Sequence, residues 1–216
     1  PSHSLNGGSL YSVQLKGNRL SGTFPSRISN SIRKLDLSFN EFSGSLPELS
    51  VSSNIEDFRV CGNRLTGSVP HTLVTQQRQL QKLHLSENSF EGIIPAFPSK
   101  SEVTELKLSN NKFIGPLNSV MLNLSPTTLN IFEVTGNKFT GTIPATIGSL
   151  TNMHTLKVDE MQLIGELPTE FGQMTALTQL EISGNLVQGR IPTQFGNLSA
   201  LRILRFERNQ ITGTVP

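Results

Sequence analysis

The chain has 216 residues, of which 18 are Lys or Arg and 16 are Asp or Glu, so its formal net charge at pH 7 is +2. This near balance excludes the strongly basic surface that binds nucleic acids or anionic membranes. No apolar run approaches the ~20 residues that a transmembrane helix needs. We therefore expect no nucleic-acid partner and no direct membrane insertion by this segment.

A fixed pattern returns nine times along the chain. Nine glycines each stand two residues after an apolar residue, and eight of them stand three residues before a proline. Self-similarity at a period of 22 to 26 residues is the signature of a solenoid, in which each repeat stacks on its neighbours. A single solenoid domain over residues 1–216 is predicted, with repeats that start near residues 10, 32, 55, 80, 103, 129, 153, 177 and 201.

Each repeat begins with a short predicted strand. The unit reads L-x-x-L-x-L-x-x-N-x-L-x-G-x-[IVLF]-P, and its L-x-L pair alternates as in a strand with one buried face. Stacked copies make a parallel sheet. We predict its strands at residues 13–15, 35–37, 58–60, 83–85, 106–108, 132–134, 156–158, 180–182 and 204–206.

An asparagine follows the predicted strand in eight of the nine copies. Its side-chain amide can satisfy backbone groups that a turn leaves unpaired. The glycine then permits a tight bend or the close approach of neighbouring coils, and the proline ends that segment. In the seventh repeat Met161 replaces the asparagine. Because a thioether cannot replace the amide's hydrogen bonds, we predict a local irregularity there.

The return arcs of the sixth to eighth repeats share a spacing of apolar residues. Over residues 144–153, 168–177 and 192–201, apolar side chains recur three residues apart, which favours a 3₁₀ or brief helical turn. Earlier arcs keep this spacing less faithfully, and repeats three to six vary in length. Irregular loops are predicted there.

The unit resembles the plant-type leucine-rich repeat, which carries the same L-x-G-x-I-P continuation. The resemblance covers nearly the whole chain. It implies an α/β-type repeat solenoid: a right-handed coil of about nine repeats with a concave parallel β-sheet and a mostly irregular or 3₁₀ convex side. Proteins with such repeats include ectodomains of plant receptor-like kinases, receptor-like proteins and polygalacturonase inhibitors, in which the concave face commonly binds a ligand.

The chain departs from these families at its ends. Their capping segments carry paired cysteines, whereas this chain has one cysteine, Cys61, and stops at the proline of its ninth repeat. Terminal repeats normally need polar caps. We expect the chain to be a fragment whose flanking caps are missing.

The residues between the two apolar positions of each strand form a central column on the concave face. The column runs Gln14, Asp36, Arg59, His84, Lys107, Glu133, Lys157, Glu181 and Arg205, and its signs alternate from Lys107 onwards. Neighbouring strands lie ~4.8 Å apart, so the alternating part is interpreted as a self-satisfying ladder of ion pairs. A charged ligand-recognition strip is the alternative interpretation.

The N-terminal half of the concave face is the predicted binding surface. Binding hot spots are usually Trp, Tyr or Arg, and this chain has no Trp and one Tyr. The candidate ligand-binding residues are Tyr11, Arg33, Asp36, Phe39, Arg59, His84, Lys107 and Arg205.

The sequence has no phosphate-binding loop, nucleophile elbow or zinc-ligand spacing, so we predict no enzyme activity, no cofactor and no metal site. Cys61 is interpreted as an inert small residue.

Two sequons, Asn123-Leu-Ser and Asn197-Leu-Ser, are candidate glycosylation sites. Pro126 directly follows the first acceptor serine, which favours Asn197.

The predicted function is non-enzymatic recognition of a protein, peptide or glycan ligand by part of an extracellular or cell-surface receptor-like protein. One alternative is an intracellular subunit that docks on a larger complex. A remote alternative is ice binding, because hydroxyl side chains flank many repeat glycines. Ile93, Ile114, Pro116, Glu166 and Arg190 interrupt that array. Fold alone does not choose among these functions.

Overall fold

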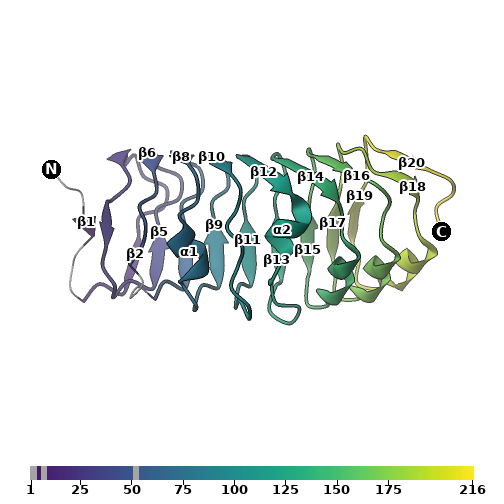
Figure 1. Cartoon of the computed structure of the whole chain (residues 1–216), viewed down its shortest axis with the longest axis horizontal. Coiled ribbons are helices and arrows are strands. Elements are labelled where there is room, and N and C mark those ends of the chain that lie inside the picture. Colours follow the sequence, from purple (N-terminus) through teal and green to yellow (C-terminus); the bar gives the residue numbers. More distant parts are fainter. Residues whose placement is uncertain (1–3, 6–8, 51–53) are drawn as a thin grey trace.

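The chain folds into an elongated solenoid whose coils stack along its long axis, with the two termini at opposite ends (Figure 1). This computed structural model describes residues 4–5, 9–50 and 54–216. Strands of successive repeats lie side by side and parallel. The predicted solenoid architecture is confirmed.

One strand from each repeat contributes to a nine-stranded parallel sheet, which is the predicted concave sheet. Its register stays constant, so that Leu106, for example, lies between Leu83 and Phe132. The middle residue of each strand is buried except in the last repeat. In chain order the strands are β2 (Ser12–Gln14), β5 (Lys34–Asp36), β7 (Asp57–Arg59), β9 (Lys82–His84), β11 (Glu105–Lys107), β13 (Ile131–Glu133), β15 (Thr155–Lys157), β17 (Gln179–Glu181) and β19 (Ile203–Arg205).

A second parallel sheet, which the sequence did not predict, forms beside the repeat glycines. Seven of its strands are continuous, and two more pair with each other, linked by one isolated bridge between Glu166 and Gln188. The strands are β3 (Ser21–Thr23), β6 (Glu41–Ser45), β8 (Arg64–Gly67), β10 (Ser89–Gly92), β12 (Lys112–Pro116), β14 (Lys138–Thr142) and β16 (Gln162–Ile164), then β18 (Gln188–Arg190) and β20 (Gln210–Thr212).

The repeat glycines are needed here for two reasons. All nine have a positive φ, from 78° to 106°, which side chains disfavour. At Gly165 an added Cβ would also lie 2.9 Å from Thr142 Cγ2 of the preceding coil. The predicted bend and the predicted close approach are therefore both confirmed.

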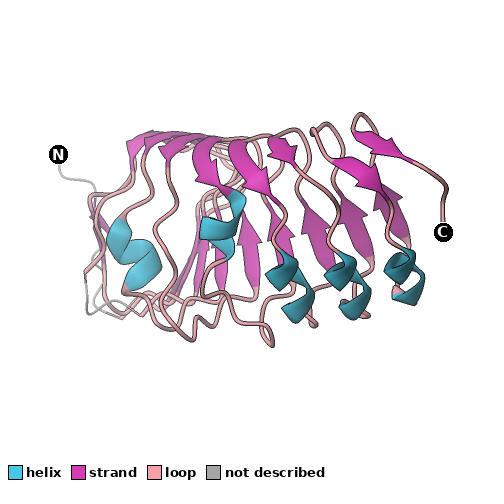
Figure 2. Ribbon diagram, turned by 45° about the vertical axis from the view of Figure 1, so that its right-hand side comes forward, coloured by secondary structure: helices cyan, strands magenta, loops and turns pink. Residues whose placement is uncertain are grey.

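The helices lie on the side of the coil opposite the nine-stranded sheet (Figure 2). The 3₁₀ helices η1 (Ala145–Ser149), η2 (Thr169–Gln173) and η3 (Thr193–Asn197) confirm the three predicted arcs. Two short α-helices, α1 (His71–Thr75) and α2 (Leu117–Met121), lie in the less regular repeats. A pair of two-residue strands, β1 (Ser4–Leu5) and β4 (Arg27–Ile28), lies near the N-terminal end.

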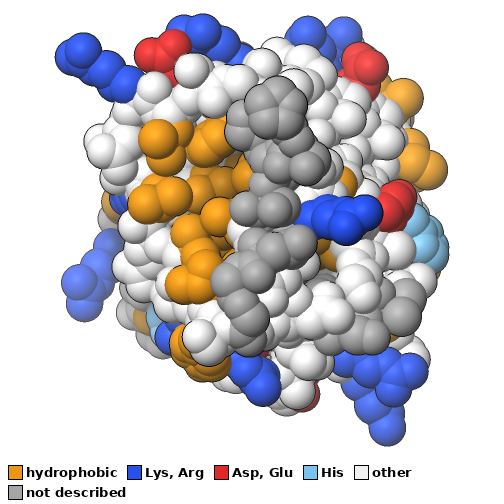
Figure 3. All heavy atoms as spheres, turned by 90° about the vertical axis from the view of Figure 1, so that its left-hand side faces the viewer, with side chains coloured by type: hydrophobic (Ala, Val, Ile, Leu, Met, Phe, Trp, Pro, Cys, Tyr) orange, Lys and Arg blue, Asp and Glu red, His pale blue; other side chains and the backbone are white. Residues whose placement is uncertain are grey.

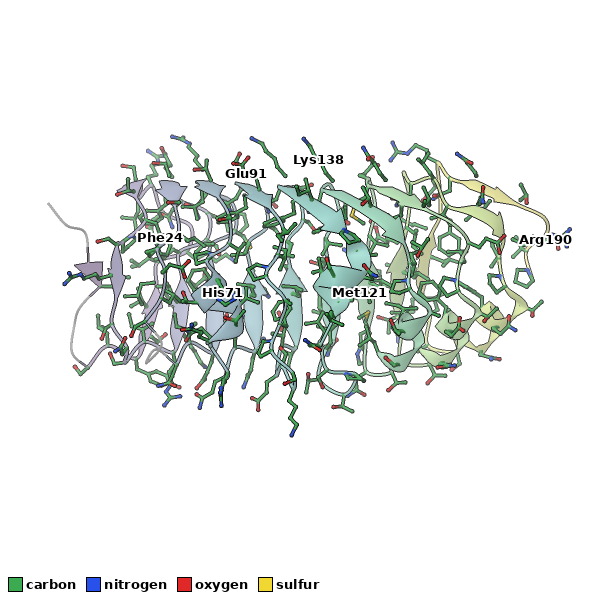
Figure 4. The ribbon with its side chains drawn as sticks, viewed as in Figure 1. Phe24, His71, Glu91, Met121, Lys138 and Arg190 are labelled. Carbon is green, nitrogen blue, oxygen red and sulfur yellow. The ribbon has the colours of Figure 1, made fainter. Side chains whose placement is uncertain are left out.

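One apolar core fills the coil along its length. Phe24, for example, is buried and points inward (Figure 4). Apolar side chains are visible on the N-terminal end face (Figure 3). In the first repeat Leu10, Leu15 and Leu20 are exposed, whereas inner repeats bury their apolar residues between two neighbours, as expected for a solenoid.

The asparagines form the predicted ladder. Asn63 Nδ2 donates to the carbonyls of Val60 and Cys61 in its own repeat and to that of Leu37 in the preceding one, while its Oδ1 accepts from Phe42 N–H. The side chain thus joins two coils through backbone groups.

Met161 interrupts this ladder, because its buried thioether offers none of these bonds. In the nine-stranded sheet the register continues unchanged from β15 to β17. The second sheet, by contrast, keeps its pairing from β14 to β16 but is interrupted after β16, which one isolated bridge between Glu166 and Gln188 links to β18. The irregularity at the seventh repeat therefore involves the side-chain ladder and the second sheet and leaves the nine-stranded sheet intact.

Candidate ligand-binding groove

The C-terminal half of the concave face is covered by ion pairs. Lys107 Nζ lies 3.2 Å from Glu133 Oε2, and Lys157 Nζ lies 3.6 Å from Glu133 Oε1 and 3.9 Å from Glu181 Oε1. Arg205 Nη1 completes the series, 3.1 Å from Glu181 Oε2. The alternating column is therefore the predicted ladder, and its charges neutralise one another.

The N-terminal half is paired differently. Arg59 makes a two-pronged contact with Asp57 on its own strand, at 2.7 and 2.9 Å, and this hydrogen bonding raises the pKa of Arg59. Asp36, on the adjoining strand, accepts a hydrogen bond from Ser38 N–H at 3.0 Å. In the part of the chain that the structure describes, Asp36 makes no ion pair.

Small residues next to this column leave a hollow of about 300 Å³, which we call the N-terminal groove. Its floor consists of Ser38, Cys61, Ser86 and Ser109, each two residues after a central-column residue. Its lining is completed by Lys16, Asp36, Phe39, Arg59, His84, Glu87, Lys107, Asn110 and Glu133. The groove thus crosses the second to fifth repeats and reaches the edges of the first and sixth.

Further along, the same row holds Thr135, Asp159, Ser183 and Glu207, whose side chains hydrogen-bond within the row. Asp159 occupies the equivalent position in the seventh repeat, where it accepts hydrogen bonds from Ser183 N–H at 2.7 Å and from Thr135 Oγ1 at 3.1 Å. Burial raises the pKa of Asp159. Ser183 Oγ in turn donates to Glu207. The polar groups of this half are occupied by one another, which leaves the N-terminal groove as the site with open recognition groups.

His84 lies in the wall of the groove and is only 7% exposed. Its Nε2 is buried and lies 2.9 Å from Glu105 Oε2. Burial, followed by the charge of Arg59, lowers the pKa of His84. Burial acts to raise the pKa of Glu105, but the hydrogen bond and charge of Lys82 outweigh it and the net shift is downward. The lowered pKa of His84 favours the neutral form of the imidazole.

Cys61 is part of the floor and has no partner sulfur. Burial is the main cause of a raised pKa for its thiol, and the charges of Glu87 and Asp36 add to it. A raised pKa keeps the sulfur protonated and weakly nucleophilic. The arrangement agrees with the interpretation of Cys61 as an inert small residue, and its small size is what opens the groove.

The structure brings together five of the eight candidate binding residues, namely Asp36, Phe39, Arg59, His84 and Lys107. Tyr11 and Arg33 lie together, with the guanidinium carbon 6.0 Å from the ring centroid. Arg33 also pairs with Glu56 at 2.9 Å, so it is partly neutralised. Arg205 lies in β19, in the last repeat.

The sequence interpretation left out the floor of the groove and two side chains beside it, Lys16 and Glu87. A signal for the floor was present: the row two residues after the central column is small in four consecutive repeats, at Ser38, Cys61, Ser86 and Ser109. A row of small residues between two rows of long ones opens a channel once the strands are stacked in register.

A larger hollow, of about 420 Å³, lies elsewhere, at α2 and η1. Its lining includes Met121 and Leu122 and contains no charged side chain, so it offers little for specific recognition.

Among the described residues, no cluster of three or more His, Cys, Asp or Glu side chains could hold a metal ion. None of the helices in those residues has the length and apolar character required to cross a bilayer.

The two sequons differ in their surroundings. Asn123 Nδ2 donates to Phe97 O at 2.9 Å, and Asn123 has a φ of 67°. Asn197 ends η3 and is exposed. The nitrogen that glycosylation modifies is therefore already engaged at Asn123.

The hydroxyl array lies on the outward face of the second sheet. Several of its hydroxyls donate to the backbone of the preceding coil, such as Thr212 Oγ1 to Gly189 O at 3.2 Å. Ile93 and Ile114 interrupt the array and are 64% and 47% exposed. Glu91 and Lys138 project outward from the same sheet (Figure 4). This mixed surface does not favour ice binding.

The repeats and the stacked parallel sheets give the chain the fold of a leucine-rich-repeat solenoid. The family model described as Leucine Rich Repeat matches residues 31–52, 79–100 and 176–198. The chain is similar to plant receptor proteins of this class. It is 39% identical over 70 residues to Receptor-like protein 34 of Arabidopsis thaliana, a match that covers 32% of this chain and 7% of that protein.

Solved structures extend the similarity over almost the whole chain. A plant peptide hormone receptor, RGFR1 in complex with RGF2, has a TM-score of 0.85 at 28% identity, and covers 96% of this chain and 34% of its own. The PEPR1–AtPEP1 structure has a TM-score of 0.71 at 25% identity, with 96% and 36% covered. The chain thus spans about a third of these receptor chains. A plant ice-binding protein, at 17% identity and a TM-score of 0.63, shares the fold alone.

Proposed function

We propose that this chain is a non-enzymatic recognition module of an extracellular receptor-like protein, and that it binds an extended peptide in the N-terminal groove. The observation that carries the proposal is the contrast along the concave face. The ion pairs and hydrogen bonds of the C-terminal half occupy its polar groups, whereas the groove keeps open carboxylates and an exposed aromatic ring.

The dimensions of the groove support an extended ligand. Its floor crosses the four strands from β5 to β11, which at ~4.8 Å per strand is a length of about 14 Å. An extended peptide advances ~3.4 Å per residue, so about four residues fit along the floor. The likeness to a plant peptide hormone receptor that was solved in complex with RGF2 supports the same ligand class.

The test is binding from a pool of random 12-residue peptides, read out by mass spectrometry of the retained sequences. Ser86→Trp fills the floor, and we expect it to abolish retention. Ser68→Trp is the matched control, because Ser68 is exposed beside the second sheet. Equal retention by both variants would show that the groove is not the site, and no retention by the unmodified protein would reject peptide binding.

The alternatives predict different results. A glycan ligand would leave the peptide pool unbound but give hits on a glycan array that Ser86→Trp removes. A structural subunit would co-purify from its native source in a fixed ratio with other chains, and Ser86→Trp would not release it.

A further inference from the structure

The residue before each ladder position, which is an asparagine in eight repeats and Met161 in the seventh, adopts a left-handed backbone conformation. In the nine repeats this row consists of Gly17, Phe39, Gly62, Glu87, Asn110, Gly136, Glu160, Gly184 and Arg208, all with φ between 53° and 73°. Glycine adopts this conformation freely, whereas a bulky side chain resists it. Phe39 is the aromatic member of the row.

The ring of Phe39 lies across the glycine of the next repeat. A Cβ added to Gly62 would be 2.6 Å from Phe39 Cδ1, so only glycine at position 62 leaves room for the ring. Phe39 remains 47% exposed. Glu87, which is also exposed, occupies the same row one repeat after Gly62 and two repeats after Phe39. The result is an accessible aromatic shelf in the wall of the groove.

Two carboxylates that line the groove with this shelf, those of Asp36 and Glu87, lack an ion-pair partner among the described residues. Their charges add to the effect of burial on the pKa of Cys61, which lies in the floor. The ring itself already carries a cation, because Lys16 Nζ lies 5.3 Å from its centroid. Lys16 is exposed and makes no ion pair with the described residues.

We propose that the Phe39 ring, with Asp36 and Glu87 beside it, anchors a basic side chain of the ligand, and that arginine fits best. In the free protein, the Lys16 ammonium group lies over the Phe39 ring, where the cation of the ligand would bind. Aromatic faces attract cations, and a guanidinium stacks on a ring while its planar fork binds a carboxylate, which an ammonium does less well. This inference rests on the proposed peptide-binding function and names the side chain that the groove selects.

The test uses two capped peptides of defined sequence, Ac-Gly-Ser-Arg-Ser-Gly-NH₂ and its Gln analogue, titrated into the ¹⁵N-labelled protein at low salt. We expect the Arg peptide to bind roughly five-fold more tightly and to shift the amide signals of Gly62 and Glu87. Lys16→Ala removes the internal competitor, so the affinity for the Arg peptide should rise about two- to three-fold.

Two variants locate the preference. Phe39→Gly should reduce the Arg-to-Gln ratio to about one while the protein still melts cooperatively, since glycine suits a φ of 56°. Glu87→Gln should weaken Arg binding about two-fold, and its matched control, Glu160→Gln in the same row, should not. Glu160 pairs with Arg208, away from the groove.

The outcomes separate this inference from the function on which it rests. If both peptides bind equally and Ser86→Trp blocks them, the groove binds peptides but the arginine anchor is wrong. If the preference for Arg survives in Phe39→Gly, the ring is not the anchor and the inference also fails. If neither these peptides nor the random pool bind, the proposed function and the inference are rejected together.

Discussion

At the scale of single residues, the asparagine ladder shows how one side chain holds two coils together. Asn137 Nδ2 donates to Val134 O of its own repeat and to Leu108 O of the preceding one, at 2.9 and 3.0 Å, and its Oδ1 accepts from Phe113 N–H. Buried backbone groups that lose such partners cost about 1–3 kcal/mol each. The ladder therefore stabilises the turns of the solenoid as well as shaping them.

Met161→Asn should restore the missing rung. The new amide would give Phe139 N–H the acceptor that its counterparts have, and we expect the free energy of unfolding to rise by about 1 kcal/mol after the loss of the thioether's packing. Chemical denaturation measures the change. Met153→Asn is the matched control, since Met153 is buried outside the ladder, and it should destabilise the protein. A loss of stability in both variants would contradict the prediction.

His84 predicts how stability depends on pH. Its pKa in the folded protein is lowered, chiefly by burial and then by Arg59, so the unfolded chain binds a proton more readily. Stability is therefore lost as pH falls through the unfolded pKa of ~6.5. His84→Gln should remove this component, so that the free energy of unfolding of the variant falls less between pH 7.5 and 5 than that of the wild type. Denaturation at both pH values tests it, with the exposed His154→Gln as control; parallel pH profiles for wild type and His84→Gln would contradict it.

At the scale of the elements, the strength of the local pattern decided what the sequence could predict. The L-x-L pair and the three-residue apolar spacing predict β2 to β19 of the concave sheet and the three 3₁₀ helices. The second sheet was missed because each of its strands runs beside a glycine with positive φ, a residue that strand propensity disfavours. Its pairing arises only from the stacking of coils. The helices α1 and α2 were missed because their arcs break the regular spacing.

The sequence predicted the candidate site only in part, because it shows residue types but not how the repeats stack. Residue type pointed to Asp36, Phe39 and Arg59, which lie in the groove. The groove itself depends on the relative sizes of residues ~25 positions apart, and this comparison is meaningful only once the repeats are stacked in register. Lys16 and Glu87 enter the site in that way and carry no signal within their own repeats.

The core of the second sheet makes an element-scale prediction. Phe113 is fully buried, and its ring lies between those of Phe90 and Phe139 at centroid distances of 6.2 and 6.3 Å. Phe113→Ala should lower the free energy of unfolding by about 3–5 kcal/mol, because it leaves a cavity between two coils. Phe113→Leu keeps most of the volume and should cost clearly less. Equal losses in the two variants would mean that the stacked ring, and not the filled volume, carries the stability.

At the scale of the whole molecule, the strands of each repeat pair only with those of adjacent repeats, so the effects of a mutation should stay local. In Phe113→Ala we expect hydrogen exchange to quicken in the fourth to sixth repeats while the eighth keeps its protection, because stability in a solenoid is a sum of nearest-neighbour terms. Exchange measured by mass spectrometry gives the profile. A uniform rise in exchange along the chain would instead show one cooperative unit.

Glycosylation tests the extracellular assignment for the molecule as a whole. Asn197 is exposed at the end of η3, whereas the Asn123 amide is held by Phe97 O and Pro126 follows its acceptor serine. A chain secreted from a eukaryotic host should therefore carry one N-glycan, at Asn197. Its intact mass should fall on enzymatic glycan removal, and Asn197→Gln should show no such fall, whereas Asn123→Gln should behave as the unmodified chain. A glycan found at Asn123 would mean that its sequon is modified before the Phe97 contact forms. If the secreted chain carried no glycan, glycosylation would no longer support an extracellular role. That role would then rest on ligand binding in the N-terminal groove alone.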